Sequence, residues 1–264
     1  MNAAAPVSDV DRTCAGTVVL WVDGAHDVAT NMARDAALLE RAAAGGLEAT
    51  VLRLFTFAPP GITLGRAQDP ARELDLEALA RAGIVWAVRP TGGRAIWHED
   101  DWTFSLVSRL SPDGWAATAA AAYERTGRLL AGAFQWLGVP ARLAPGTPHG
   151  PGGPQARGGA APPCFASTAR HELVLEGRKL AGIAQRVSRG ALLQQGSLLL
   201  GGAHVRLAEF TQVADRDRRR VELDEAAAVA GPWLGEDRSL WRLADAIERL
   251  LPGVRRGVQA GAGS

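Results

Sequence analysis

The sequence has little net charge, no long apolar run and almost no lysine. A strong net charge or a long apolar run would have indicated a nucleic-acid-binding or a membrane protein. Its 264 residues include 29 lysines and arginines and 28 aspartates and glutamates, and this near balance gives no strong field to attract nucleic acid or an acidic membrane. No apolar run reaches the ~18 residues that span a bilayer, and the first residues lack the basic and apolar regions of a secretory signal. We expect a cytoplasmic protein without a nucleic-acid or membrane partner, acting as a monomer.

Cysteine is also scarce. Cys14 and Cys164 are the only two, and they stand in such different contexts that a disulfide framework is not expected. The five histidines show no metal-ligand spacing with each other or with the cysteines. We therefore predict free thiols and no bound metal.

The scarcity of lysine is the most unusual feature of the composition. Lys179 is the only lysine among the 29 lysines and arginines. At the surface the two cations exchange at little cost, but only lysine supplies a compact point charge that can lose its proton when desolvated. Lys179 is therefore a candidate functional group. The alternative is one surface lysine retained by chance.

The apolar patterns predict one α+β domain, with a mixed, largely antiparallel sheet flanked by helices. Residues 144–163 are almost all Gly, Pro and Ala, which predicts a mobile loop inserted within that domain. We expect a flexible arm over 1–15, the domain over 16–253 and a tail over 254–264. The predicted strands are 17–23, 49–57, 84–89 and 103–110, with a three-stranded meander over 171–177, 178–187 and 190–201. We expect the strand 84–89 to be buried. The predicted helices are 29–45, 75–83, 114–138, 222–230 and 238–250.

A glycine turn, "RPTGGRAIWH" (89–98), is the first candidate site. Gly92 and Gly93 permit close approach of backbone to a ligand, and the flanking Arg89 and Arg94 are suited to hold a phosphate or carboxylate. Ordinary turn glycines are the commoner explanation. His98 is a candidate general base, or simply a hydrogen-bonded histidine of the core.

A thiol is the second candidate. Cys164 stands where the Gly/Pro segment returns to regular patterning, a position that suits a reactive thiol, and a nearby cation such as Lys179 would lower its pKa. A buried structural cysteine is the alternative.

Taken together, four ordered blocks resemble the catalytic domain shared by lipoate–protein ligases, octanoyltransferases and biotin ligases. They are "ATNMARDAALLERAAA", "ITLGRAQ", "RPTGGRAIWHEDDWTFSLV" and "GRKLAGIAQRVSRGALLQQGSLLL". Two details, Arg94 in "PTGGRA" and Cys164 in "CFASTARHELVLEGRK", resemble the LipM-type octanoyltransferases in particular.

This resemblance implies transfer of an octanoyl group from octanoyl-acyl carrier protein to a lysine of a lipoyl-carrier domain, in protein lipoylation. The carrier domain would be a glycine cleavage H protein or a 2-oxoacid dehydrogenase E2, and no cofactor would be needed. The implied catalytic residues are Cys164, which forms an octanoyl thioester, and Lys179. The implied substrate-binding residues are Arg89, Thr91, Gly92, Gly93, Arg94, His98, Gly182, Ala184 and Gln185.

The sequence departs from the family pattern at Ile183, where a serine is usual, at Gln195, where a histidine is usual, and at Val88, where a second arginine is usual. Two alternatives therefore stay open. One is an ATP-dependent lipoate or octanoate ligase, which would use ATP and Mg²⁺. The other is a non-catalytic relative that binds acyl groups or carrier domains.

Overall fold

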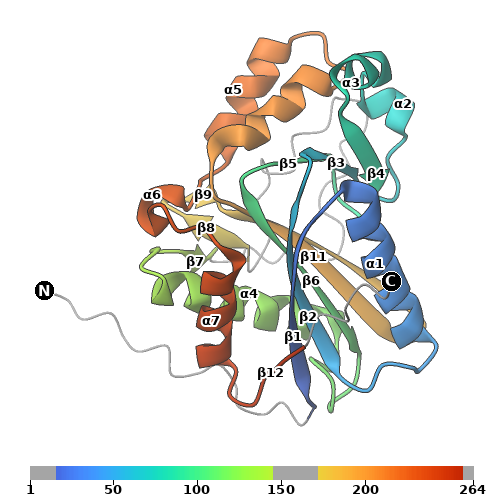
Figure 1. Ribbon diagram of the computed structural model, residues 1–264, viewed down its shortest axis with the longest axis vertical. Helices are drawn as coiled ribbons and strands as arrows, with labels where there is room; N and C mark the ends of the chain where they lie inside the picture. Colours follow the sequence, from blue (N-terminus) through green and yellow to red (C-terminus); the bar gives the residue numbers. More distant parts are fainter. Residues whose placement is uncertain (1–15, 145–171, 258–264) are drawn as a thin grey trace, which may run out of the picture.

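The computed structural model describes residues 16–144 and 172–257, in which a six-stranded mixed sheet forms the centre (Figure 1). The predicted arm, most of the Gly/Pro segment and most of the tail lie outside these residues, and so does Cys164. The strands of the sheet, in spatial order, are β10 (Ala181–Ser188), β11 (Ala191–Leu199), β6 (Asp101–Arg109), β2 (Thr50–Phe57), β1 (Val18–His26) and β12 (Arg255–Arg256).

Strand direction in this sheet follows from how the strands are connected. Helix α1 (Val28–Ala43) joins β1 to β2, and this crossover makes the two strands parallel. Short turns join β10 to β11, which are antiparallel, and β6 lies antiparallel to both of its neighbours. The expected mixed, largely antiparallel sheet is confirmed.

Helix α1 covers one face of the sheet. It begins at Asp27, whose side chain accepts a hydrogen bond from the Thr30 amide, as an N-cap should. Its C-terminal half packs Leu39 against Val107 of β6 and Leu193 of β11. The same face also carries buried polar side chains, to which we return below.

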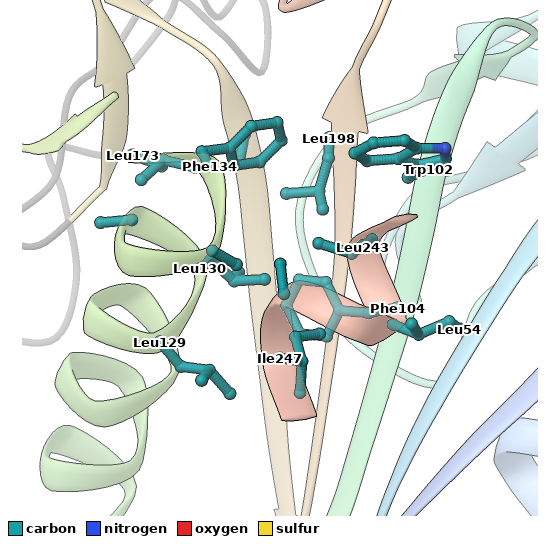
Figure 2. Packing of buried hydrophobic residues seen from close by; sticks show 14 of the residues in the cluster. Leu54, Trp102, Phe104, Leu129, Leu130, Phe134, Leu173, Leu198, Leu243 and Ile247 are labelled. Carbon is teal, nitrogen blue, oxygen red and sulfur yellow. The ribbon is translucent and has the colours of Figure 1, made fainter. Parts of the chain in front are cut away.

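Helices α4 (Ala119–Trp136) and α7 (Leu240–Leu250) cover the opposite face. Figure 2 shows Leu130 and Phe134 of α4 and Ile247 of α7 meeting the side chains that β6 and β11 present on this face. This is the largest apolar cluster of the described residues, and it fixes the sheet against both helices. The helix predicted over residues 114–138 is confirmed, although it begins only at Ala119.

Two small sheets flank the large one. In the first, β3 (Gly61–Leu64) lies between β4 (Val85–Val88) and β5 (Ile96–His98). It packs with η1 (Gly202–Phe210) and α3 (Leu76–Ala82), and α5 (Arg216–Ala226) packs on η1. The second consists of β7 (Arg142–Leu143), β8 (Leu173–Leu175) and β9 (Arg178–Lys179). Short helices α2 (Pro70–Glu73) and α6 (Gly231–Leu234) complete the described elements.

Two expectations were wrong. Strand β4 is not buried, because it is the edge of its sheet and Val85, Trp86 and Val88 are all exposed. The predicted meander is broken at Leu180, whose amide donates to the Leu173 carbonyl. The chain therefore leaves the small sheet at β9 and enters the large one at β10. Residues 202–210, for which no element was predicted, form the 3₁₀ helix η1.

Among the described residues, no helix is both long and apolar enough to cross a membrane.

Candidate active site

A pocket opens where the glycine turn meets β10 and β11. Its apolar lining residues include Met32, Phe57, Ile96 and Ile183. Polar groups converge on it from several elements: Thr63, Arg89, His98, Thr103, Lys179, Gln195 and Ser197. An apolar cavity with a few convergent polar groups is the usual form of a small-molecule site.

The structure brings six of the predicted site residues together in this pocket: Arg89, Gly93, His98, Lys179, Gly182 and Ala184. Thr91, Gly92 and Arg94 belong to the same turn but do not line the pocket. Gln185 does not line it either, because its side chain accepts a hydrogen bond from Gln194 on the α4 side of the sheet. Cys164 lies outside the described residues, and its role stays a prediction.

Arg89 stabilises the glycine turn by hydrogen bonds to backbone carbonyls. It is only 5% exposed, and its guanidinium donates to the carbonyls of Gly92 (Nε, 3.0 Å), Arg94 (Nη2, 2.7 Å) and Thr63 (Nη1, 3.2 Å). These bonds hold together the two ends of the turn and the neighbouring strand β3. Arg89 is thus bonded to the protein's own backbone, where the sequence suggested contact with an anion.

Gly93 is required by geometry at this turn. Its φ is +95°, a conformation that costs other residues energy, and a Cβ there would lie 2.6 Å from Arg89 Nη2. Gly65 at the end of β3 lies against the same turn, since a Cβ there would lie 1.9 Å from the Gly93 carbonyl oxygen. The two glycines let two backbones and one guanidinium pack within a single turn.

Lys179 lies at the pocket, on β9. Its ammonium Nζ is 2.7 Å from Glu172 Oε1, and both side chains are 6% exposed. The Lys179 backbone is held by pairing with Val174 and by the Ala228 amide, which donates to its carbonyl. The only lysine of the chain is therefore a buried, anchored cation, and chance survival at the surface does not describe it.

Glu172 also faces the only tyrosine of the chain. Burial raises the pKa of Tyr123 well above its usual range, and the negative charge of Glu172 raises it further. Tyr123 therefore stays a neutral phenol across the physiological range.

His98 is held on three sides. Its Nδ1 lies 2.9 Å from Asp101 Oδ2, its Nε2 lies 2.8 Å from Thr63 Oγ1, and its ring stacks on Phe57 with centroids 4.0 Å apart. Asp101 Oδ2 also accepts from Ser197 at 2.7 Å. This arrangement fixes the imidazole as part of the pocket wall, and it matches the description of a hydrogen-bonded core histidine.

A buried polar cluster beneath the pocket was missed by the sequence reasoning. Arg53, Ser105 and Gln195 lie directly opposite one another on three adjacent strands. Asp35 of α1 accepts a hydrogen bond from each of them, at 2.8, 2.6 and 2.6 Å respectively. Burial raises the pKa of Asp35 above its usual value, although the charge of Arg53 and hydrogen bonds from Ser105 and Gln195 act in the opposite direction.

Arg53 joins this cluster to a second carboxylate. Its Nε donates to Asp23 Oδ2 at 2.7 Å, and Arg34 reaches the same carboxylate from α1. Burial alone would raise the pKa of Asp23, but hydrogen bonds from Arg34 and Arg53 and their positive charge bring it below its ordinary value. Sequence patterns could have flagged a charged residue inside the apolar strand "TVLRLFTF", but they could not have named its partners.

The described residues contain no group of three or more His, Cys, Asp or Glu side chains placed to hold a metal ion.

Comparison with known proteins supports the family resemblance. The family described as the lipoyl protein ligase A/B catalytic domain matches residues 27–230. An octanoyltransferase LipM from Geobacillus kaustophilus is 37% identical over 65% of this chain and 61% of its own length. Another, from Kyrpidia tusciae, is 33% identical over 85% of this chain and 82% of its own length. The match to the first therefore spans less than two thirds of that relative.

Solved structures agree on the fold. A bi-partite lipoate protein ligase from Thermoplasma acidophilum, studied with its E2 lipoyl domain, superposes with a TM-score of 0.67 at 19% identity, over 93% of this chain and 88% of its own. Lipoate-protein ligase A bound with ATP superposes with a TM-score of 0.65 at 18% identity, over 93% and 90%. At this level of identity the likeness concerns the fold alone.

Proposed function

Because the chain belongs to the lipoyl protein ligase A/B catalytic-domain family, we propose that it is an octanoyltransferase of protein lipoylation. The observation that carries this proposal is the 33% identity to a LipM octanoyltransferase over 85% of this chain and 82% of the relative. The donor would be octanoyl-acyl carrier protein, and the acceptor a lysine of a lipoyl-carrier domain, either a glycine cleavage H protein or a 2-oxoacid dehydrogenase E2.

The proposed reaction has two steps. In the first, the Cys164 thiol gives up its proton, its sulfur forms a C–S bond to the octanoyl carbonyl carbon, and the C–S bond to the carrier breaks. The carrier thiolate leaves and takes up that proton. In the second, the amine of the acceptor lysine attacks the Cys164 thioester, an amide forms, and the Cys164 thiol is released. The first step exchanges one thioester for another and the second runs downhill, so no ATP or other cofactor is required.

Lys179 is the described group best suited to assist. It is a buried cation on the wall of the pocket, and a hydrogen-bond donor placed at a developing oxyanion stabilises the transition state. Its pairing with Glu172 keeps the ammonium in one place. Because Lys179 is buried and held in one place, it is better suited to a role in the reaction than a solvent-exposed lysine would be.

The pocket also suits the octanoyl chain. Met32, Phe57, Ile96 and Ile183 offer apolar surface, and burial of each CH₂ contributes ~0.8 kcal/mol. Chain-length preference from such a wall is modest, because a single methylene changes binding only by that amount. Ile183, where the family pattern has serine, is one of these lining residues and also packs against the main apolar cluster.

One experiment separates this proposal from its alternatives. The protein is incubated with octanoyl-acyl carrier protein without ATP and examined by intact mass spectrometry. We expect an octanoyl adduct on the wild type that is absent from Cys164→Ser, followed by transfer to a lipoyl domain. No adduct, but modification of the lipoyl domain with octanoate, ATP and Mg²⁺, would identify a ligase with an inert Cys164. Binding without either reaction would identify a non-catalytic relative.

A further inference from the structure

Gln195 connects the glycine turn to the interior of the protein. It is 6% exposed, lies on β11 and reaches the pocket wall. Its Oε1 accepts a hydrogen bond from Thr91 Oγ1 at 2.7 Å, and its Nε2 donates to Asp35 Oδ2 at 2.6 Å. Thr91 is fully buried although it belongs to a turn.

We propose that Gln195 is a positioning residue, which holds the turn 90–94 in its place over the pocket by linking Thr91 to Asp35. The effect of Gln195 on catalysis rests on the proposed octanoyl transfer. Its effect on the position of the turn is independent of that proposed function.

The far end of this link is rigid. Asp35 Oδ1 accepts from Ser105 and from Arg53, so the carboxylate is bonded to three neighbouring strands of the sheet at once. Arg53 is itself fully buried and is bonded to Asn31 of α1 as well. A side chain bonded to Asp35 is therefore fixed relative to both α1 and the central sheet.

The near end, the turn itself, is also held by bonds to its backbone. The Arg66 amide donates to the Thr91 carbonyl at 2.9 Å, and Arg186 reaches the Pro90 carbonyl at 3.4 Å. Arg89 joins the turn mainly to itself and to β3. The Thr91–Gln195 bond ties a side chain of the turn directly to the central sheet.

The chemistry of the position requires both a donor and an acceptor. The Asp35 oxygen that faces Gln195 needs a donor, and the Thr91 hydroxyl needs an acceptor. An amide supplies one of each. Alanine supplies neither, and leaves two buried polar groups without these partners.

The same strand offers a matched control. Gln194 is fully buried and also makes two hydrogen bonds through its amide, with Thr126 at 2.6 Å and Gln185 at 3.0 Å. It lies on the opposite face of the sheet, toward α4. Gln194→Ala therefore removes an equally buried amide without touching the turn.

Hydrogen–deuterium exchange tests the positioning itself. In Gln195→Ala we expect the amides of residues 91–94 to exchange at least about tenfold faster than in the wild type. In Gln194→Ala their exchange should change less than about twofold. Equal exchange of these amides in the two variants would overturn the proposal.

Kinetics test the consequence. We expect kcat for octanoyl transfer to fall about tenfold to a hundredfold in Gln195→Ala, the size of effect that a misplaced site produces. KM for the acyl carrier protein should change less than about threefold, and Gln194→Ala should keep a kcat near that of the wild type. A kcat in Gln195→Ala equal to that of Gln194→Ala would contradict a catalytic consequence.

Two further cases separate the role of Gln195 from misfolding and from failure of the proposed function. If Gln195→Ala does not fold, Thr91→Val removes the same bond from the turn and leaves β11 unchanged, and the same rise in exchange is expected. Unchanged exchange there would refute the link. If the wild type itself transfers no octanoyl group, the proposed function fails, and the exchange rates alone decide the role of Gln195.

Discussion

Replacing Lys179 by methionine tests whether the lone lysine serves the reaction or only the fold. Methionine keeps the length of the side chain and removes the charge. Glu172 is then left 6% exposed without the ammonium that lies 2.7 Å away. Breaking a buried ion pair from one side typically costs ~3–5 kcal/mol, and we expect a loss of that size in the free energy of unfolding, measured by urea denaturation at pH 7.

The double variant Lys179→Met/Glu172→Gln removes the whole pair. Two neutral side chains of similar size bury no lone charge, and replacement of a whole buried pair is often close to neutral. We therefore expect the double variant to recover most of the lost stability. Octanoyl transfer should stay roughly 10²–10³-fold below the wild type, because a donor at the developing oxyanion contributes about that much to kcat.

Lys179→Arg keeps the charge but changes its shape. The guanidinium is planar and prefers a two-pronged contact with a carboxylate, so we expect it to retain the contact with Glu172 and to lose transfer activity. A double variant that regains its stability and transfers octanoyl groups at the wild-type rate would refute the catalytic role of Lys179. Full activity in Lys179→Arg would refute the part of the argument that depends on lysine rather than on any cation.

Three further predictions concern Arg53, Asp23 and Gly93. Arg53→Met leaves Asp35 and Asp23 buried without the cation between them, so unfolding in urea at pH 7 should cost ~3–5 kcal/mol less than in the wild type. Asp23→Asn should also lower stability at pH 7. Since the folded pKa of Asp23 is lowered, its contribution is present above its ordinary pKa of ~3.9 and is lost as pH falls through the lowered value. The difference between Asp23→Asn and wild type should therefore shrink below about pH 4; a difference that does not change with pH would contradict this. Gly93→Ala should lower the thermal midpoint because of its φ of +95° and the contact with Arg89, whereas Gly92→Ala, whose Cβ meets nothing within 4 Å, should not; equal losses would contradict the geometric argument.

Much of the fold could be predicted from the sequence because its elements have clear local signals. The Asp27 cap and the apolar spacing of Met32 and Leu39 mark α1, and the Gly138 stop marks the end of α4. The exposure of β4 could not be predicted in this way. An apolar run such as "IVWAVR" reads the same in a central strand and in an edge strand, and only the pairing of the whole sheet shows that Trp86 faces solvent.

The motifs named Gly93, His98 and Lys179, and the structure places all three at one pocket. Contacts between distant segments have no such signal in the sequence. The sequence led us to expect Arg89 to bind an anion. Nothing in "VRPTGGR" shows that its guanidinium is bonded to carbonyls of its own turn. Asp35 and Gln195 are 160 residues apart in sequence, and their contact depends on the packing of α1 against β6 and β11.

The pairing of Lys179 with Glu172 changes what a lone lysine can contribute. An ammonium and a carboxylate 2.7 Å apart have no net charge between them, so their combined field on a thiolate weakens quickly with distance. A hydrogen bond from the ammonium to an oxygen in direct contact is weakened much less, because it acts at short range. Under the proposed function, Lys179 would then act chiefly by donating to the developing oxyanion and less by lowering the pKa of Cys164. In that case the position of Lys179 would matter more than its charge, and the buried carboxylate of Glu172 would serve to hold that position.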